Sequence, residues 1–266
     1  MDFKKSRRIK GSVPLLPKLG LAMKKTSILV FLTALFVLLL CPAVFATDVN
    51  VSAEVTKTPG NTNLLAITVK DGADPYTQTF VIRNNAKGEY DVGKYVVYVA
   101  TSGNDKIDAC FICGIIGNLN DINPYMSYDE TYGFLDKNGE PATLEVSYDP
   151  PEIMPFGQLG GYNYYGFKVS HTTIIQNNMT FYCDLTTPYS QYTISNVKNI
   201  SASGPLLNFY SNPYHIFTRQ ISHIMDNNQP AEVTAYISAH LYPFGTTTWW
   251  MKLRVWTGGE YKITTS

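Results

Sequence analysis

The sequence predicts a mainly β protein, and two observations carry that prediction. Short apolar runs recur along the chain and are interrupted about every 8–12 residues by Gly, Pro, Asn and Asp, which is the spacing of an all-β sandwich or barrel. Apolar residues at helical spacing are almost absent outside one short segment. We therefore expect an N-terminal β-sandwich followed by a second β-rich domain with one short helix.

The first 46 residues are predicted to be a leader that does not enter the fold. Residues 23–46 have the parts of a secretory signal peptide: a basic start at 23–27, an apolar run at 28–40, and small residues before the expected cleavage after Ala46. This predicts an exported protein of the cell envelope or the extracellular space. The alternatives are a lipoprotein modified at Cys41 and an uncleaved membrane anchor.

Removing the leader changes the charge balance of the chain. The leader contains 8 of the 21 Lys and Arg residues but 1 of the 21 Asp and Glu residues, so 13 basic and 20 acidic side chains remain, with a net charge of −7. An acidic domain without a basic cluster argues against nucleic acid and against an anionic membrane surface as partners. We expect no membrane attachment after the signal peptide is cleaved.

The first predicted domain covers residues 47–117. Its apolar runs are separated by the turn-forming segments TPGNT, DGADP, NNAKGEYD and SGND. The strands expected between these turns are 49–57, 63–70, 77–83, 93–101 and 106–115.

One motif in this domain carries a specific structural signal. Asp91, Gly93 and Tyr95 have the spacing of a tyrosine corner, in which a Tyr at the start of a strand folds over the preceding loop and its hydroxyl donates a hydrogen bond to backbone a few residues upstream. On this motif and the strand spacing, residues 47–117 resemble a bacterial immunoglobulin-like β-sandwich domain. They lack the Cys and Trp that mark antibody-type domains. The resemblance implies a spacer or adhesive module rather than an enzyme.

The second predicted domain covers residues 118–266. It opens with a loop-rich polar segment that contains the hairpin signal DKNGE. Further strands are expected at 143–148, 162–170, 179–185 and 192–197. A short helix is expected over about 213–225, because Asn212 suits an N-cap, Pro213 suits the first helical position, and apolar residues follow at helical period until DNNQP.

The segment from Ala231 to Trp256 predicts two antiparallel strands joined by PFGTT. Small aliphatic side chains alternate with polar and aromatic ones, as in a sheet with one buried and one solvated side. Exposed rings among hydrogen-bonding groups suit stacking on sugar rings. The alternative is that the predicted helix or the first domain covers the rings. The candidate binding face consists of Tyr236, His240, Tyr242, Trp250 and Trp256.

Three cysteines remain after cleavage of the leader. Cys110 and Cys113 lie three residues apart on one predicted strand, so their side chains point to opposite sides of the sheet and are poorly placed to bond each other or to share a metal. Either one of them forms a disulfide with Cys183, or all three are buried free thiols.

No catalytic motif and no metal site is predicted. The histidines, His171, His215, His223 and His240, do not have a recognised metal-binding spacing. The acidic residues after the first domain offer oxygen ligands for a structural calcium ion, but the spacing of an EF-hand is not met. These residues are Asp121, Asp129, Glu130, Asp136 and Glu140. We expect no cofactor.

Together these features predict an exported, non-catalytic binding or structural protein that recognises a glycan or a surface protein through a sheet face. The first alternative is an extracytoplasmic polysaccharide hydrolase that uses carboxylates of residues 118–140, which a pocketed pair of carboxylates would favour. The second alternative is an assembly component of a surface layer or coat, with an edge strand as the polymer contact.

Overall fold

A computed structural model of the protein describes residues 49–58, 63–82, 85–102, 106–151, 161–173, 178–188, 193–203, 215–221, 230–241, 245–256 and 258–266. All of them belong to one compact unit, Phe45–Ser266. The chain is mainly β, as the sequence predicts. No helix in the described ranges is both long and apolar enough to cross a membrane. The predicted signal peptide lies outside these ranges, so export stays a prediction.

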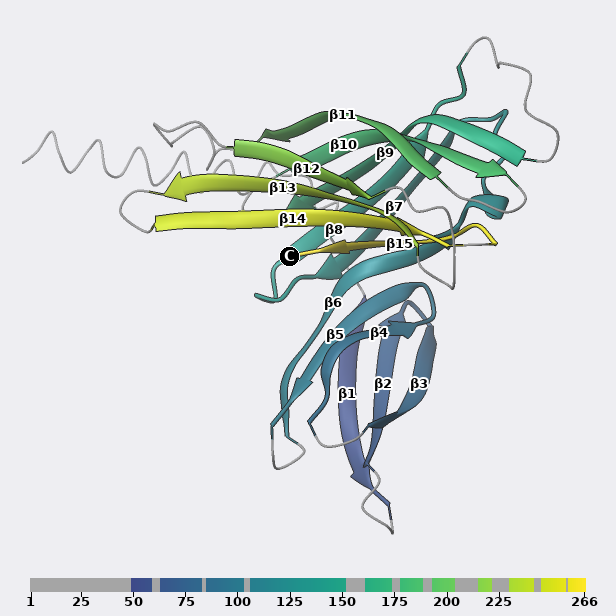
Figure 1. The fold of residues 1–266 in the computed structure, drawn as a ribbon. Coiled ribbons are helices and arrows are strands. Elements are labelled where there is room, and N and C mark those ends of the chain that lie inside the picture. Colours follow the sequence, from purple (N-terminus) through teal and green to yellow (C-terminus); the bar gives the residue numbers. More distant parts are fainter. Residues whose placement is uncertain are drawn as a thin grey trace, which may run out of the picture. The chain divides into compact units, whose positions relative to one another are not determined.

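The described strands form three antiparallel sheets (Figure 1). The three-stranded sheet has the order β1 (Asn50–Lys57), β2 (Asn63–Asp71), β3 (Asp74–Ile82). The five-stranded sheet has the order β11 (Thr193–Ser203), β10 (Asn178–Pro188), β9 (Gly161–Thr173), β8 (Pro141–Tyr148), β7 (Tyr128–Leu135). The seven-stranded sheet has the order β12 (His215–Ile221), β13 (Ala231–Leu241), β14 (Gly245–Val255), β15 (Glu260–Thr265), β6 (Ile107–Asn118), β5 (Tyr95–Thr101), β4 (Lys87–Val92).

One hydrophobic core contains side chains from all three sheets. The alternation along the strands places it there: in β8, for example, every second side chain is buried. The five-stranded and seven-stranded sheets meet in this core, where the ring of Phe167 on β9 contacts the ring of Tyr261 on β15 edge-on, with centroids 5.8 Å apart. A short 3-10 turn, η1 (Leu119–Asp121), also joins them, because the Tyr164 hydroxyl on β9 donates to the Leu119 carbonyl oxygen.

The prediction of a helix over 213–225 is wrong for residues 215–221, which are the part of that range that the structure describes. Residues 215–221 form strand β12, which pairs with β13 from His215 opposite Ser238 to Ile221 opposite Glu232. The sequence HIFTRQI contains β-branched and aromatic residues that fit a pleated strand, and the exposed edge of β13 supplies the hydrogen-bonding partner. This tertiary pairing overrides the weak helical period. The rest of the predicted helix lies outside the described residues.

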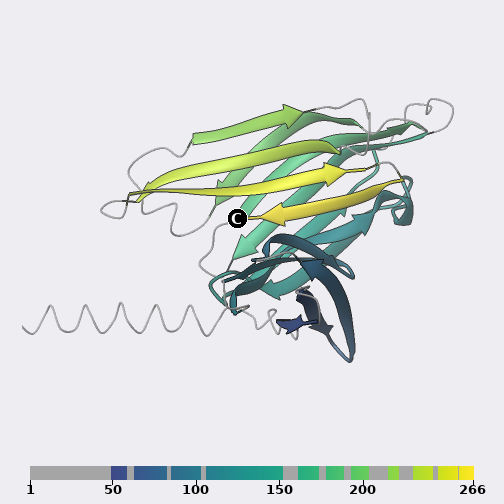
Figure 2. The same ribbon diagram turned by 60° about the horizontal axis from the view of Figure 1, so that its bottom comes forward.

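The seven-stranded sheet joins the two domains that the sequence predicts on either side of residue 117. Strand β6 pairs with β5 on one edge and with β15 on the other, and β15 is the last strand of the chain. Figures 1 and 2 both show β13, β14 and β15 running side by side, with β6 continuing the sheet. Strands β4 to β6 therefore belong to one sheet with strands of the second region, through the pairing of β6 with β15, and an immunoglobulin-like sandwich for residues 47–117 stays a prediction.

Tyr95 is buried as a tyrosine corner requires, but its partner differs from the expected one. The hydroxyl donates to the carboxylate of Asp71, 2.9 Å away, and not to backbone a few residues upstream. Asp71 also pairs with Lys94 at 2.8 Å. Lys94, helped by the hydrogen bond from Tyr95, holds the pKa of Asp71 below its usual value despite partial burial. Gly93, at φ +58, forms the tight turn between β4 and β5 together with Lys94.

Cys110, Cys113 and Cys183 carry free thiols, which is the second of the two alternatives that the sequence leaves open, with Cys110 half-buried. The first two lie on β6 in the seven-stranded sheet, whereas Cys183 lies on β10 in the five-stranded sheet. Burial raises the pKa of Cys110 to about 11 and that of Cys113 to about 12, and it raises the pKa of the fully buried Cys183 as well. The thiols behave as small apolar side chains of the core.

Candidate functional site

The candidate binding face predicted from the C-terminal strands lies on the outer side of β13 and β14. The two strands pair as expected, with Tyr236 directly opposite Trp250. The alternate side chains of both strands, such as Val233 and Leu253, are fully buried. Tyr236, Trp250 and Trp256 are half-buried. His240 belongs to β13, but the structure does not describe its side chain. Tyr242 lies outside the described residues.

Lysine side chains stand over both tryptophans of this face. The Lys252 Nζ atom lies 5.6 Å from the ring centroid of Trp250, and the Lys262 Nζ atom lies 5.4 Å from that of Trp256. A cation–π contact of this kind stabilises by about 0.5–1 kcal/mol at an exposed site. A sugar that stacked on either ring from that side would have to displace the ammonium group.

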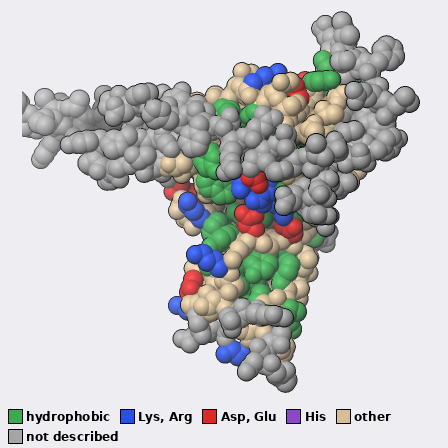
Figure 3. All heavy atoms as spheres, in the orientation of Figure 1, with side chains coloured by type: hydrophobic (Ala, Val, Ile, Leu, Met, Phe, Trp, Pro, Cys, Tyr) green, Lys and Arg blue, Asp and Glu red, His purple; other side chains and the backbone are tan. Residues whose placement is uncertain are grey.

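Carboxylates bind these lysines and Arg254 to other strands of the same sheet. Glu232 on β13 accepts a hydrogen bond from Arg254 Nε at 2.9 Å and pairs with Lys252 at 3.6 Å. Burial alone would raise the pKa of Glu232, but Arg254 and Lys252 hold it below its usual value. Asp91 on β4 binds Lys262 at 2.6 Å. Figure 3 shows Lys and Arg side chains directly beside Asp and Glu side chains on the visible surface. The face is thus a half-buried, ion-paired surface.

A second surface, which was not predicted from the sequence, is a groove on the outer side of the five-stranded sheet. It has a volume of about 700 Å³ and contains two half-buried tyrosines on this side of the sheet, Tyr165 and Tyr182. We call it the tyrosine groove. One row of directly paired residues crosses all five strands along it: Asp129 on β7, Ser147 on β8, Lys168 on β9, Tyr182 on β10 and Lys198 on β11.

Irregular pairing shapes this groove. The register of β10 shifts against β11 on both sides of Tyr182, and against β9 between Cys183 and Leu185. The buried Asp184 carboxylate accepts hydrogen bonds from the Gly166 backbone N–H at 2.8 Å and from Asn196 Nδ2 at 2.7 Å. Gly166 and Asn196 both have positive φ, at +73 and +47, which Gly and Asn tolerate best. Bulges bend a strand and redirect its side chains, and they are frequent next to functional sites.

The acidic residues that the sequence grouped into one loop are dispersed. Asp129 and Glu130 are on strand β7, and Asp136 and Glu140 belong to the turn between β7 and β8. Asp136 accepts hydrogen bonds from the backbone N–H groups of Asn138 and Glu140 at 2.8 and 2.9 Å. Within the described ranges, no group of three or more His, Cys, Asp or Glu residues could hold a metal ion.

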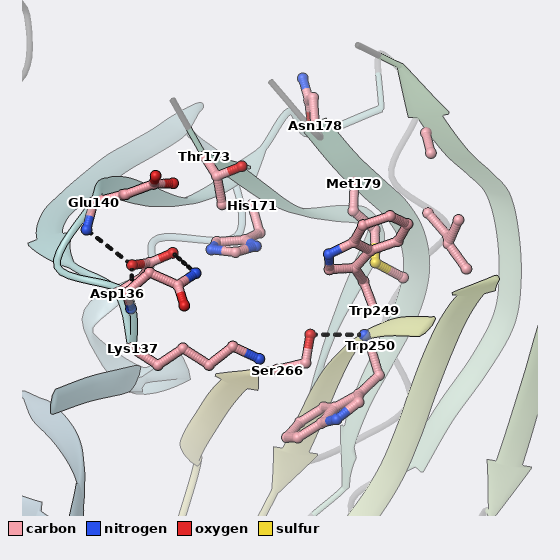
Figure 4. A pocket seen from close by; sticks show the side chains of 13 residues that line it. Asp136, Lys137, Glu140, His171, Thr173, Asn178, Met179, Trp249, Trp250 and Ser266 are labelled. Atoms are coloured by element: carbon pink, nitrogen blue, oxygen red, sulfur yellow. Dashed lines mark hydrogen bonds between the residues drawn. The ribbon is translucent and has the colours of Figure 1, made fainter. Parts of the chain in front are cut away.

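The third feature is a cavity of about 170 Å³ lined by both large sheets and by the turn between β7 and β8, which we call the His171 cavity. Its apolar lining comes from Met179 on β10, Ile237 on β13 and Trp249 on β14. Figure 4 shows the His171 ring between Asp136 and Trp249, and Lys137 extending toward Ser266. The sequence pattern placed Trp249 on the aliphatic side of its strand, and this inner position brings it into the cavity.

His171 is the unusual polar group of this cavity. Its ring lies parallel to that of Phe134, with an interplanar angle of 11° and centroids 6.4 Å apart. The Nε2 atom is shut off from solvent and has no hydrogen-bond partner in the part of the chain that the structure describes. Burial lowers the pKa of His171 to about 4, against a small opposing effect of the Asp136 carboxylate. The imidazole is therefore neutral at pH 7.

Acidification should destabilise the protein through His171. A histidine in the unfolded chain titrates near 6.5, whereas the folded-state pKa is about 4, so the unfolded state binds the proton first as the pH falls. This residue should cost the folded state about 3 kcal/mol between pH 6.5 and pH 4, and nothing further below that window. The measurement is urea unfolding of the parent and of His171→Phe at both pH values. Equal losses in the two proteins would show that His171 titrates normally in the fold.

No family model matches this chain, and no curated protein matches it. Among solved structures, a hypothetical protein from Listeria monocytogenes EGD-e is similar over 55% of this chain and 99% of that chain. The sequence identity is 10% and the TM-score is 0.26. A TM-score this low does not establish a common fold.

Proposed function

We propose that this is an exported, non-catalytic glycan-binding protein whose ligand lies across the tyrosine groove. The observation that supports the proposal is the row of paired residues through the groove. In that row Tyr182 is flanked by Lys168 on one neighbouring strand and Lys198 on the other, with Ser147 one strand further on. A ring is thus surrounded by hydrogen-bonding groups on a concave surface.

This combination suits a carbohydrate for two physical reasons. The C–H face of a pyranose packs on the face of an aromatic ring, while its hydroxyl groups lose bound water and need polar partners in return. The groove supplies both, because half-buried tyrosines alternate with Asp129, Glu145 and two lysines. Its volume of about 700 Å³ lies in the range of ordinary ligand sites and is large enough for more than one sugar unit.

The tyrosine groove is a better candidate than the face formed by β13 and β14. Both surfaces offer rings among charged groups, but Trp250 and Trp256 each carry a lysine over the ring. Lys198, in contrast, is exposed at the end of the groove row. Glu145 is bound by Lys168, which fixes both side chains beside Tyr182. The groove is therefore arranged to receive a ligand with less rearrangement of its own contacts.

The experiment is a glycan-array screen of residues 47–266, followed by titration of the best glycan into variants. Tyr182→Ala should weaken binding by tenfold or more, since an aromatic contact stabilises by about 0.5–1.5 kcal/mol beyond area burial and 1.4 kcal/mol is a factor of ten. Tyr125→Ala is the matched control, because that ring is 68% exposed and outside the groove. If Tyr182→Ala binds like the parent while Trp250→Ala does not, the ligand lies on β13 and β14 and the groove assignment is wrong.

A polysaccharide hydrolase is the second candidate, and the groove contains the observation that favours it. Asp129 is paired with Ser147, so it lies diagonally across from Glu145 on the adjacent strand, within the same groove. Glycoside hydrolysis uses two carboxylates on either side of the scissile bond. Incubating the bound glycan with the protein and assaying new reducing ends separates the two functions. Cleavage that Asp129→Asn abolishes would replace the binding proposal with the enzyme.

A further inference from the structure

The His171 cavity has the size and lining of a small-molecule site that is separate from the tyrosine groove. The groove lies on the outer side of the five-stranded sheet, whereas the cavity is lined by that sheet together with β13 and β14. A cavity of roughly 150 Å³ in another protein is large enough to hold benzene. The 170 Å³ here is thus sufficient for one six-membered ring.

The lining is divided into an apolar part and a polar part. Trp249 offers a flat ring, and Met179 and Ile237 add aliphatic surface around it. On the other side are His171 and Asn178. The Oδ1 atom of Asn178 already accepts hydrogen bonds from the hydroxyl groups of Ser170 and Thr180. The Asp136 carboxylate is likewise engaged by backbone N–H groups of its own turn. Lys137, Thr173 and Ser266 add further polar groups to the lining, and His171 Nε2 is the buried side-chain atom that lacks a hydrogen-bond partner within the described residues.

The buried Nε2 atom of His171 has no hydrogen-bond partner in the described part of the chain, and this destabilises the fold. This suggests which kind of ligand the cavity binds. A buried polar atom without a partner destabilises a fold by about 1–3 kcal/mol. Neutral imidazole offers one donor and one acceptor nitrogen, so either a hydroxyl hydrogen or a hydroxyl oxygen of a ligand can satisfy it. The lining contains Asp136, Lys137 and Glu140, so a charged ligand would lose its hydration in this half-apolar space and meet like charge as well as opposite charge.

We propose that the His171 cavity binds an uncharged, hydroxylated six-membered ring, with one face of the ring on Trp249 and a hydroxyl group hydrogen-bonded to the imidazole of His171. A phenol and a pyranose share this chemistry. Binding requires a small shift of the His171 side chain toward the cavity, because the Nε2 atom is covered. The proposal does not depend on the tyrosine groove, since the two sites share no lining residue.

The test is titration of residues 47–266 with phenol, with methyl β-glucopyranoside and with benzene, following Trp fluorescence and the ¹⁵N resonances of the His171 side chain. We expect phenol or the glucoside to saturate in the millimolar range and to shift the His171 resonances. Saturation by phenol alone assigns an aromatic ligand, and saturation by the glucoside alone assigns a sugar. Benzene binding as tightly as both hydroxylated rings would overturn the role of His171, and saturation by none of the three would overturn the site.

Two variants separate loss of the site from loss of the fold. His171→Phe keeps a flat ring beside Phe134 and removes the unpaired nitrogen, so it should fold and should bind the hydroxylated probe at least tenfold more weakly. Ala202→Met adds a side chain at a lining position of the cavity and should abolish binding. Ser201→Met is its control, because the exposed Ser201 precedes Ala202 on β11 and points to the opposite side. Equal binding by Ala202→Met and Ser201→Met, with both folded, would contradict the assignment.

Discussion

Replacing Gly114 with Ala should prevent the protein from reaching its native structure. A Cβ atom at this position would overlap the carbonyl group of Ile263, lying 3.0 Å from its carbon and still closer to its oxygen. Because the obstacle is the backbone of β15, no side-chain rotation can relieve it. Strand β6 would have to move away from β15 at Gly114, which pairs with Thr264. The expected loss is more than about 4 kcal/mol, the size reached only by the severest substitutions.

The control for this prediction is Gly88→Ala on β4. A Cβ atom there meets nothing within 4 Å, so the same chemical change should alter the free energy of unfolding by no more than about 1 kcal/mol. Thermal unfolding followed by circular dichroism distinguishes the two variants. A Gly114→Ala protein that melts within a few degrees of Gly88→Ala would mean that β6 and β15 do not pack as closely as described, and that the two predicted domains are less tightly joined.

Phe167→Ala should cost about 3–5 kcal/mol, the usual range for removing a fully buried phenyl ring. Phe167 is 0% exposed on β9, and its ring contacts that of Tyr261 on β15. The substitution leaves a cavity where the five-stranded and seven-stranded sheets meet, and neither backbone can close it without disturbing its own hydrogen bonds.

Phe111→Ala is the matched control for Phe167→Ala. Phe111 is half-buried on β6 and stacks on Tyr98 within one sheet, with centroids 5.2 Å apart. Its loss should cost about 1 kcal/mol, since little area is withdrawn from water. Urea unfolding gives both values. If the two variants lose the same free energy, Phe167 does not fill a space between the sheets.

The β fold could be predicted from the sequence because its signal is local. In the C-terminal strands the buried residues Val233, Ala235 and Ile237 alternate with polar ones, and the structure confirms that alternation. Strands β4 and β7 were missed because Gly88, Asp129 and other turn-forming residues interrupt their apolar pattern. Strand β12 was mistaken for a helix because its edge pairing with β13 is not visible in its own residues.

The candidate sites depend on contacts that no local pattern contains. The row through the tyrosine groove requires the correct register of five strands, including the bulges beside Asp184, and a slip of one residue would move Tyr182 to the other side of the sheet. The His171 cavity brings together residues from Asp136 to Ser266. Trp249 is the clearest example. The alternation of the strand predicts that its side chain points inward, but it does not predict that a cavity lies beside the ring.

The rates at which the free thiols of Cys113 and Cys183 are alkylated can report local opening of the fold. Cys113 and Cys183 are buried, and their raised pKa values leave almost no thiolate for an alkylating reagent at neutral pH. Labelling must therefore wait for a fluctuation that exposes the sulfur. Since Cys113 lies in the seven-stranded sheet and Cys183 in the five-stranded sheet, their separate labelling rates report whether the sheets open together or one before the other.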